Sequence, residues 1–137
     1  MTQRIEKQLL DFLFTEYGID KGALSRELFM TKGQIAELAQ NGFLFGSHMH
    51  HHVALDTAES SQLIESELCA SKELLESLVK KPITLISYPH GIVINNTIIT
   101  IAKKVGFTHG VSIEARAVQK GDSPFYIPRF DVNDIET

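Results

Sequence analysis

Short apolar segments that alternate with helical patterns limit most strongly what this chain can fold into. Strands are predicted over 43–45, 83–86, 107–113 and 125–127, and the first two are apolar runs predicted to be buried. Short apolar runs bounded by turn-forming residues are typical of strands that are buried on both faces. Helices and buried strands that alternate at these spacings predict α/β units built around parallel strands.

The intervening segments carry the periodicity of amphipathic helices. Helices are predicted over 5–17, over about 32–41, from a Thr57 cap to the residues before Pro82, and from Asn95 or Asn96 through 105. Gly18 and Gly106 follow two of them as stop signals. A capping box of Thr31 and Gln34 marks the start of the second helix. Residues 21–30 have no clean period, so no helix is predicted there.

Size and composition favour a single compact domain over residues 1–137. The chain is 43% hydrophobic and 22% charged with a formal charge of −4, and no dense Lys/Arg run suggests nucleic acid or a membrane as a partner. As written the chain has no signal peptide, which predicts a cytoplasmic protein. That expectation lapses if the natural protein extends further at its N-terminus. Cys69 lies within a helical apolar pattern and is expected to be a buried structural thiol.

Four histidines, His48, His50, His51 and His52, directly follow the first apolar segment. His48 and His52 are spaced i, i+4, so in a helical turn their imidazoles would share a face and converge on one divalent cation, with zinc favoured. His50 and His51 would then point away, as rim or supporting groups. A solvated or packing cluster and a purification tag after Gly46-Ser47-His48-Met49 are the other interpretations. Well-patterned sequence on both sides argues against a tag.

Residues 42–52 resemble the second motif of the NodB-type polysaccharide deacetylases, an apolar strand followed by Gly-Ser-His-Ser/Thr, two variable residues and His. The resemblance implies that His48 and His52 are metal ligands. Met49 departs from the usual Ser/Thr.

The segment Ser87-Tyr88-Pro89-His90-Gly91 resembles the third motif of the same family, commonly Tyr-Pro-Tyr-Gly in one branch. His90 replaces the usual aromatic. The resemblance implies that this turn lines the substrate groove through Tyr88, Pro89 and Gly91, and that the backbone N–H of His90 stabilises an oxyanion.

Residues 127–131 resemble a Leu-Pro-Arg strand end found in that branch, so Arg129 is a candidate to orient a carboxylate by a bidentate pair. A surface salt-bridge residue is the equal alternative for Arg129.

The resemblance spans about 27–134 and implies a partial or distorted (β/α) barrel of the NodB/glycoside hydrolase-deacetylase type that lacks its first strand. The family's first motif is a strand ending in Asp-Asp, where one aspartate is the general base and the other completes an Asp-His-His metal site. No Asp-Asp pair occurs in this sequence. Asp56 and Asp131 are weaker candidates to supply a carboxylate.

The leading hypothesis is a metal-dependent hydrolase that removes N- or O-acetyl groups from a carbohydrate, in a chain without the catalytic Asp-Asp motif. The alternative is a non-catalytic metal- or sugar-binding remnant that pairs with another chain. A third hypothesis is an unrelated α/β protein that binds metal incidentally. An open sheet edge further predicts a homodimer or another association that covers it.

Overall fold

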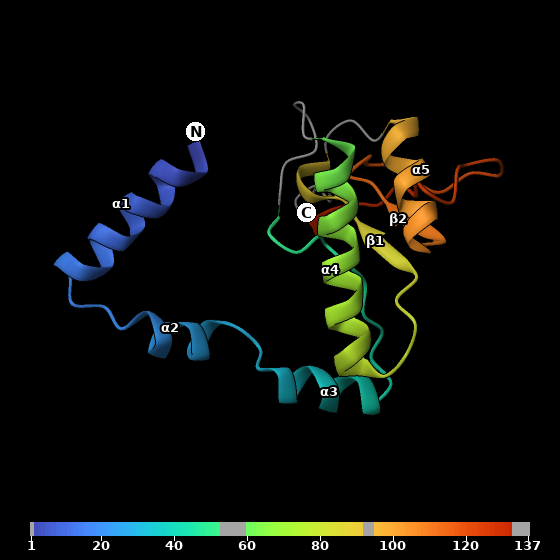
Figure 1. Cartoon of the computed structure of the whole chain (residues 1–137). Helices are drawn as coiled ribbons and strands as arrows, with labels where there is room; N and C mark the ends of the chain where they lie inside the picture. Colours follow the sequence, from blue (N-terminus) through green and yellow to red (C-terminus); the bar gives the residue numbers. More distant parts are fainter. Residues whose placement is uncertain (1, 53–59, 92–94, 133–137) are drawn as a thin grey trace.

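The computed structural model describes residues 2–52, 60–91 and 95–132. Helices α4 (Ser61–Val79) and α5 (Asn96–Val105) lie side by side, and α3 (Lys32–Gln40) packs against α4 (Figure 1). Leu68 of α4, Ile86 of the sheet and Ala102 of α5 are almost fully buried in one apolar cluster. The core therefore lies between these helices and the sheet.

The sheet is parallel, as the sequence predicts. Strand β1 (Leu85–Ser87) pairs with β2 (His109–Val111), and single parallel bridges add Ser47 beside Ile86 and Ile127 beside Val111. The order across the sheet is thus Ser47, β1, β2, Ile127. The strands predicted over 83–86 and 107–113 are confirmed in place, but regular pairing covers only three residues of each. The segment 125–127 pairs through one bridge only.

The predicted buried strand over 43–45 is wrong. Phe43 and Leu44 are 61% and 93% exposed, and pairing begins only at Ser47, which bonds to β1. On the other side of Ser47 the sheet pairs with no other segment among the described residues. A segment at the edge of a sheet is paired on one side only, and burial of its side chains depends on what packs over the faces of the sheet, so apolar composition alone does not bury it.

Helix boundaries follow the capping residues. Thr31 and Gln34 form the predicted capping box of α3, and Asn95 caps α5, which ends at Gly106 with a φ of 95°. Helix α4 begins later than predicted, because Ser60 is its N-cap and accepts a hydrogen bond from the Leu63 N–H. The predicted cap Thr57 lies outside the described residues. Cys69 is half-buried in α4, and burial raises the pKa of its thiol.

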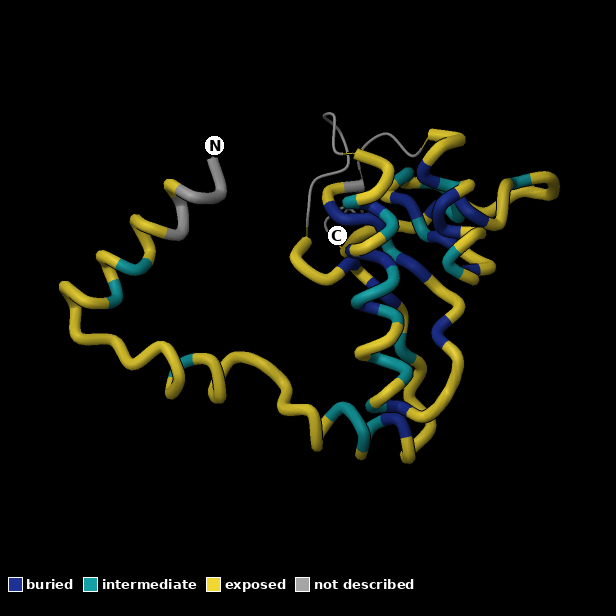
Figure 2. The backbone as a smooth tube through the Cα atoms, in the orientation of Figure 1, coloured by how far each residue is buried: buried dark blue, intermediate teal, exposed yellow. Residues whose placement is uncertain are grey.

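The chain begins with an extended arm formed by α1 (Thr2–Glu16) and α2 (Lys21–Leu28), which stands apart from the packed unit (Figure 1). The predicted first helix is confirmed, yet its apolar residues Leu9 and Phe12 are 56% and 60% exposed. Helix α2, which the sequence did not predict, is capped by Asp20 and contains no buried residue. In Figure 2 the part of the arm that carries a burial colour is mostly exposed, with a few intermediate residues.

Within the described residues, no helix is both long and apolar enough to cross a membrane.

Candidate functional site

The histidine segment follows the Ser47 bridge at the carboxyl end of the parallel strands, where ligand sites of α/β folds gather. His48 Nδ1 lies 2.8 Å from the backbone carbonyl oxygen of Ser87, the last residue of β1. A carbonyl can only accept, so Nδ1 carries the proton and donates it. In a neutral imidazole the Nε2 lone pair is then available to a ligand.

The rings of His48 and His52 are close together, with centroids 4.8 Å apart and planes at 65°. The helical turn expected between them is wrong: the backbone is left-handed at Met49 and His52, with φ of 62° and 56°. The two rings therefore meet through a folded loop. Met49, which replaces the usual Ser/Thr, is only 7% exposed and belongs to the core.

His50 and His51 face a different group. His51 Nδ1 lies 2.7 Å from Oε1 of Glu67 in α4, and the backbone N–H groups of His50 and His51 both donate to Glu67 Oε2, at 3.2 and 2.7 Å. Glu67 is 6% exposed. Burial raises the pKa of this carboxyl, but the hydrogen bonds from His51 and His50 outweigh that effect and hold it below its ordinary value.

Glu67 is not among the site residues predicted from the sequence. A signal was present, because Glu67 follows Ile64 by three positions and precedes Ser71 by four, and so shares the inward face of α4 with them. A charged residue at such a position requires partners within the protein. Those partners lie in a loop 16 and 17 residues earlier in the chain.

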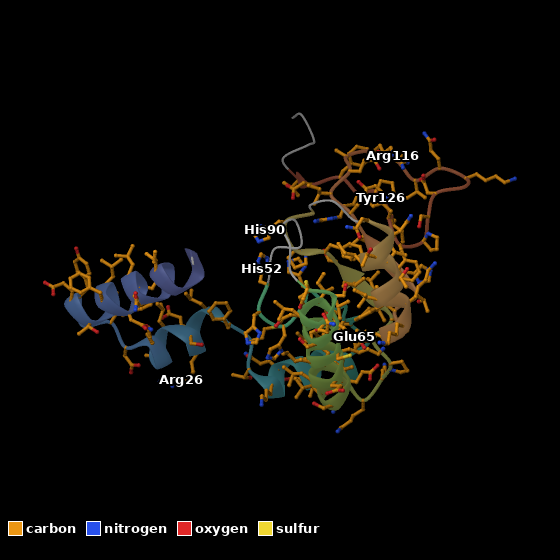
Figure 3. The ribbon with its side chains drawn as sticks, turned by 45° about the horizontal axis from the view of Figure 1, so that its top comes forward. Arg26, His52, Glu65, His90, Arg116 and Tyr126 are labelled. Carbon is orange, nitrogen blue, oxygen red and sulfur yellow. The ribbon has the colours of Figure 1, made fainter. Side chains whose placement is uncertain are left out.

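His90 adds a third imidazole beside the pair. It sits in the short turn Pro89–Gly91 with a left-handed backbone, and its ring centroid is 4.6 Å from that of His52. Figure 3 shows the labelled His52 and His90 side by side. His48, His52 and His90 thus form a row of rings.

The Tyr88 and Pro89 side chains, predicted to line the substrate groove, are buried. Tyr88 is 2% exposed and its hydroxyl donates to the Phe125 carbonyl oxygen at 3.2 Å. Its ring lies against Gly110, where an added Cβ would come within 2.7 Å of Tyr88 Cε2. Tyr88 thus holds the turn against β2 and Phe125, and of the side chains at 88–90 only that of His90 is exposed to a ligand.

Arg129 follows Ile127 by two residues and so lies at the edge of the sheet opposite to Ser47. Its Nε donates to the Ser112 carbonyl oxygen at 2.8 Å, and its backbone N–H donates to the Glu114 carbonyl oxygen at 3.0 Å. These bonds hold Arg129 Nε, and with it the guanidinium group, beside Ser112 just after β2. The carboxylate partner predicted for Arg129 stays a prediction.

Two imidazoles are an incomplete metal site. Among residues 2–52, 60–91 and 95–132, no three His, Cys, Asp or Glu side chains are grouped closely enough to hold a metal ion. Asp131 belongs to no such group, and Asp56 lies outside the described residues. The residues that the structure describes therefore fit two positions of such a site, and a third protein ligand is not grouped with them.

Comparisons with known proteins agree with the motifs. Residues 4–110 match the family described as polysaccharide deacetylase. YxkH of Bacillus subtilis (strain 168), a protein assigned to the polysaccharide deacetylases, is 31% identical over 104 residues, which are 76% of this chain and 37% of that protein. The poly-beta-1,6-N-acetyl-D-glucosamine N-deacetylase of Staphylococcus aureus (strain MRSA252) is 28% identical over 113 residues, covering 77% of this chain and 39% of that protein.

Solved structures show the same fold. The deacetylase PplD of Streptococcus pyogenes, in complex with acetate, superposes with a TM-score of 0.70 at 24% identity over 78% of this chain and 46% of that one. The BpsB deacetylase domain of Bordetella bronchiseptica superposes with a TM-score of 0.65 at 20% identity, covering 74% and 48%. The chain thus spans less than half the length of each of these proteins.

Proposed function

The chain belongs to the polysaccharide deacetylase family, and on this premise we propose that it supplies His48 and His52 to a metal-dependent hydrolase that removes N- or O-acetyl groups from a carbohydrate. The proposal rests above all on one observation. The two histidine rings are 4.8 Å apart at the carboxyl end of the parallel strands, and one of them is oriented by the carbonyl of the adjacent strand. Orientation of a metal-binding imidazole by a carbonyl on its other nitrogen is a recurring device.

Two imidazole nitrogens are a donor set that suits zinc and similar divalent cations. His48 and His52 are the residues that would hold the ion. When bound, such a cation acts as a Lewis acid toward an acetyl carbonyl. The Ser87 carbonyl keeps the His48 ring in the tautomer whose Nε2 can coordinate.

In the proposed reaction, water adds to the acetyl carbonyl carbon and the bond from that carbon to the sugar nitrogen or oxygen breaks. A proton from the water passes to that nitrogen or oxygen, and acetate leaves. The backbone N–H of His90 is proposed to donate to the oxygen that becomes negatively charged, since positioned amides stabilise such oxyanions. Arg129 is proposed to orient a carboxylate. Both roles come from the family resemblance, and the turn at 88–91 and the bonds of Arg129 to the strand ends support them by holding each group at the same end of the sheet.

His48, His52, His90 and Arg129 do not supply a general base or a third metal ligand. The general base and third ligand of the family are an Asp-Asp pair, and no such pair occurs in the sequence. We further propose that the four-segment sheet is part of a barrel of the family's type. The alternative, a metal- or sugar-binding remnant without catalysis, is favoured by the absence of a three-ligand group from the described residues.

Zinc titration of the full chain by calorimetry, together with release of acetate from acetylated chitooligosaccharides, tests the proposal. Replacing both His48 and His52 with Ala should weaken zinc binding by at least about 100-fold, more than loss of a supporting residue costs. His109→Ala is the matched control, because His109 is an exposed histidine at the amino end of β2. Equal zinc affinity in the double variant and the control would refute the metal site. Zinc binding without acetate release would favour the remnant.

A further inference from the structure

Glu67 is an ionisable side chain buried in the core face of α4. It directly precedes Leu68 and lies one turn before Ser71, which are 1% and 5% exposed, and it is itself 6% exposed. A carboxylate in such a position destabilises a protein unless hydrogen bonds replace the lost water. The presence of Glu67 there calls for a specific set of donors.

The donors come from residues 48–52, here called the histidine loop. Two consecutive backbone N–H groups, of His50 and His51, converge on Oε2, while His51 Nδ1 donates to Oε1. Charge-assisted bonds of this kind are about twice as strong as neutral ones. Glu67 therefore fixes the position of the loop backbone as well as that of one side chain.

The same helix also holds the residue before the loop. Ser71, one turn after Glu67, has its hydroxyl 2.6 Å from that of Ser47, and both hydroxyls are buried. Helix α4 thus holds the loop on both sides of His48.

The loop needs such support because its backbone is strained. Met49 and His52 both adopt left-handed φ values, which carry a steric cost for residues with a Cβ and persist only where surrounding contacts impose them. Met49 and His52 flank His50 and His51, whose backbone N–H groups donate hydrogen bonds to Glu67. The left-handed backbone at Met49 and His52 folds the loop so that the His52 ring lies beside the His48 ring.

We propose that Glu67 is a positioning residue: its carboxylate holds residues 49–52 in the left-handed conformation that brings the His48 and His52 rings together. The effect on metal binding rests on the proposed function. The effect on the loop does not, because it concerns only contacts within the chain.

Glu67→Ala removes all three acceptor contacts and should release the loop. Glu67→Gln keeps a carbonyl oxygen for the two backbone N–H groups, and its amide can donate to His51 Nδ1 after a change of imidazole tautomer, so it should restore the conformation. Glu65→Ala is the matched control. It makes the same change two residues away on α4, where Glu65 is paired with Lys104 of α5 at 2.8 Å.

The readouts on the full, metal-free chain are the nuclear Overhauser effect between the His48 and His52 rings and the hydrogen exchange of the His51 amide, with circular dichroism to check folding. We expect wild type, Glu67→Gln and Glu65→Ala to keep the ring contact and Glu67→Ala to lose it. In a zinc titration the affinity of Glu67→Ala should fall about 10- to 100-fold, and the other two should stay within about threefold of wild type.

A folded Glu67→Ala chain that keeps the ring contact and its zinc affinity would overturn the proposal. If that variant does not fold, the same readouts on Glu67→Leu decide, because leucine fills the buried space without an acceptor. In the wild type, a His51 amide that exchanges as fast as an exposed loop amide would equally overturn it. If wild type binds no zinc, the proposed function fails, whereas the ring contact still decides the role of Glu67.

Discussion

Helix α1 of the N-terminal arm and helix α4 of the packed unit both follow amphipathic patterns, yet they differ in what those patterns accomplish. In α1 the apolar residues are exposed, for example Leu9 at 56%, whereas in α4 Leu68 is 1% exposed. The residues that bear on chemistry, from His48 to Arg129, all lie in the packed unit or in loops attached to it. An amphipathic pattern therefore predicts a helix, but only packing turns that helix into a support for a site.

One substitution in each region tests this difference most directly. Leu68→Ala should lower the free energy of unfolding by about 2–5 kcal/mol, because it opens a cavity in the core. Leu9→Ala should change it by less than about 0.5 kcal/mol, because its side chain is already in water. Urea unfolding measures both. A Leu9→Ala cost close to that of Leu68→Ala would mean that the arm is packed in solution.

Two tyrosines sharpen the same contrast. Tyr88→Phe removes the donor to the buried Phe125 carbonyl and should cost about 1 kcal/mol, while Tyr17→Phe, in an exposed residue after α1, should cost almost nothing. Burial raises the pKa of Tyr88 from its ordinary 10.0 to about 12. The neutral phenol is thus favoured in the folded state, so its stabilising effect is present below pH 10 and is lost as the pH rises toward 12.

Thermal unfolding of wild type and Tyr88→Phe across this alkaline range measures the difference. The difference in melting temperature between wild type and Tyr88→Phe should become smaller as the pH rises from 10 toward 12. A gap that stays constant through pH 12 would show that ionisation of Tyr88 is not coupled to folding.

The smallest effect is expected at the surface of the packed unit. Asp122 accepts two hydrogen bonds from Arg116, each 2.8 Å, which, with the bond from the Gln119 N–H, lower the pKa of this carboxyl to about 2. A lowered pKa stabilises the folded state above the ordinary 3.8, and that contribution is lost as the pH falls toward 2. Asp122→Asn should therefore slightly lower the melting temperature at neutral pH and have no effect near pH 2.

Asp11→Asn is the counterpart of this variant in the arm, where Asp11 pairs with Lys21. It should leave the melting temperature of the packed unit unchanged at every pH. A larger effect from Asp11→Asn than from Asp122→Asn would contradict the division between the two regions.

Sequence patterns predicted the elements that depend on local chemistry. The capping box at Thr31 and Gln34 and the Asn95 cap fixed the starts of two helices correctly. Helix α2 was missed because its eight residues have no clean apolar period, and its N-cap, Asp20, was not predicted. The run at 43–45 was mistaken for a buried strand because burial depends on neighbours that a local pattern does not reveal.

The candidate site was predicted less completely. The pair His48 and His52 followed from its spacing and from the family resemblance, but the helical turn invoked for it does not occur. Left-handed backbone at a methionine and a histidine is not encoded by residue type in the way that a glycine turn is. The contacts of Glu67 with the loop join segments 16 and 17 residues apart and depend on how α4 packs.

The motif Gly46-Ser47-His48 has a structural meaning of its own. A Cβ at Gly46 would come within 3.2 Å of the Leu85 carbonyl oxygen, and the Ser47 hydroxyl is bonded to Ser71 in the core. Gly46 and Ser47 therefore both contribute to the packing of the sheet edge, independently of any metal. A Cβ at position 46 would push the backbone that leads into His48 away from β1, so the motif joins the packing of this edge to the placement of the first histidine.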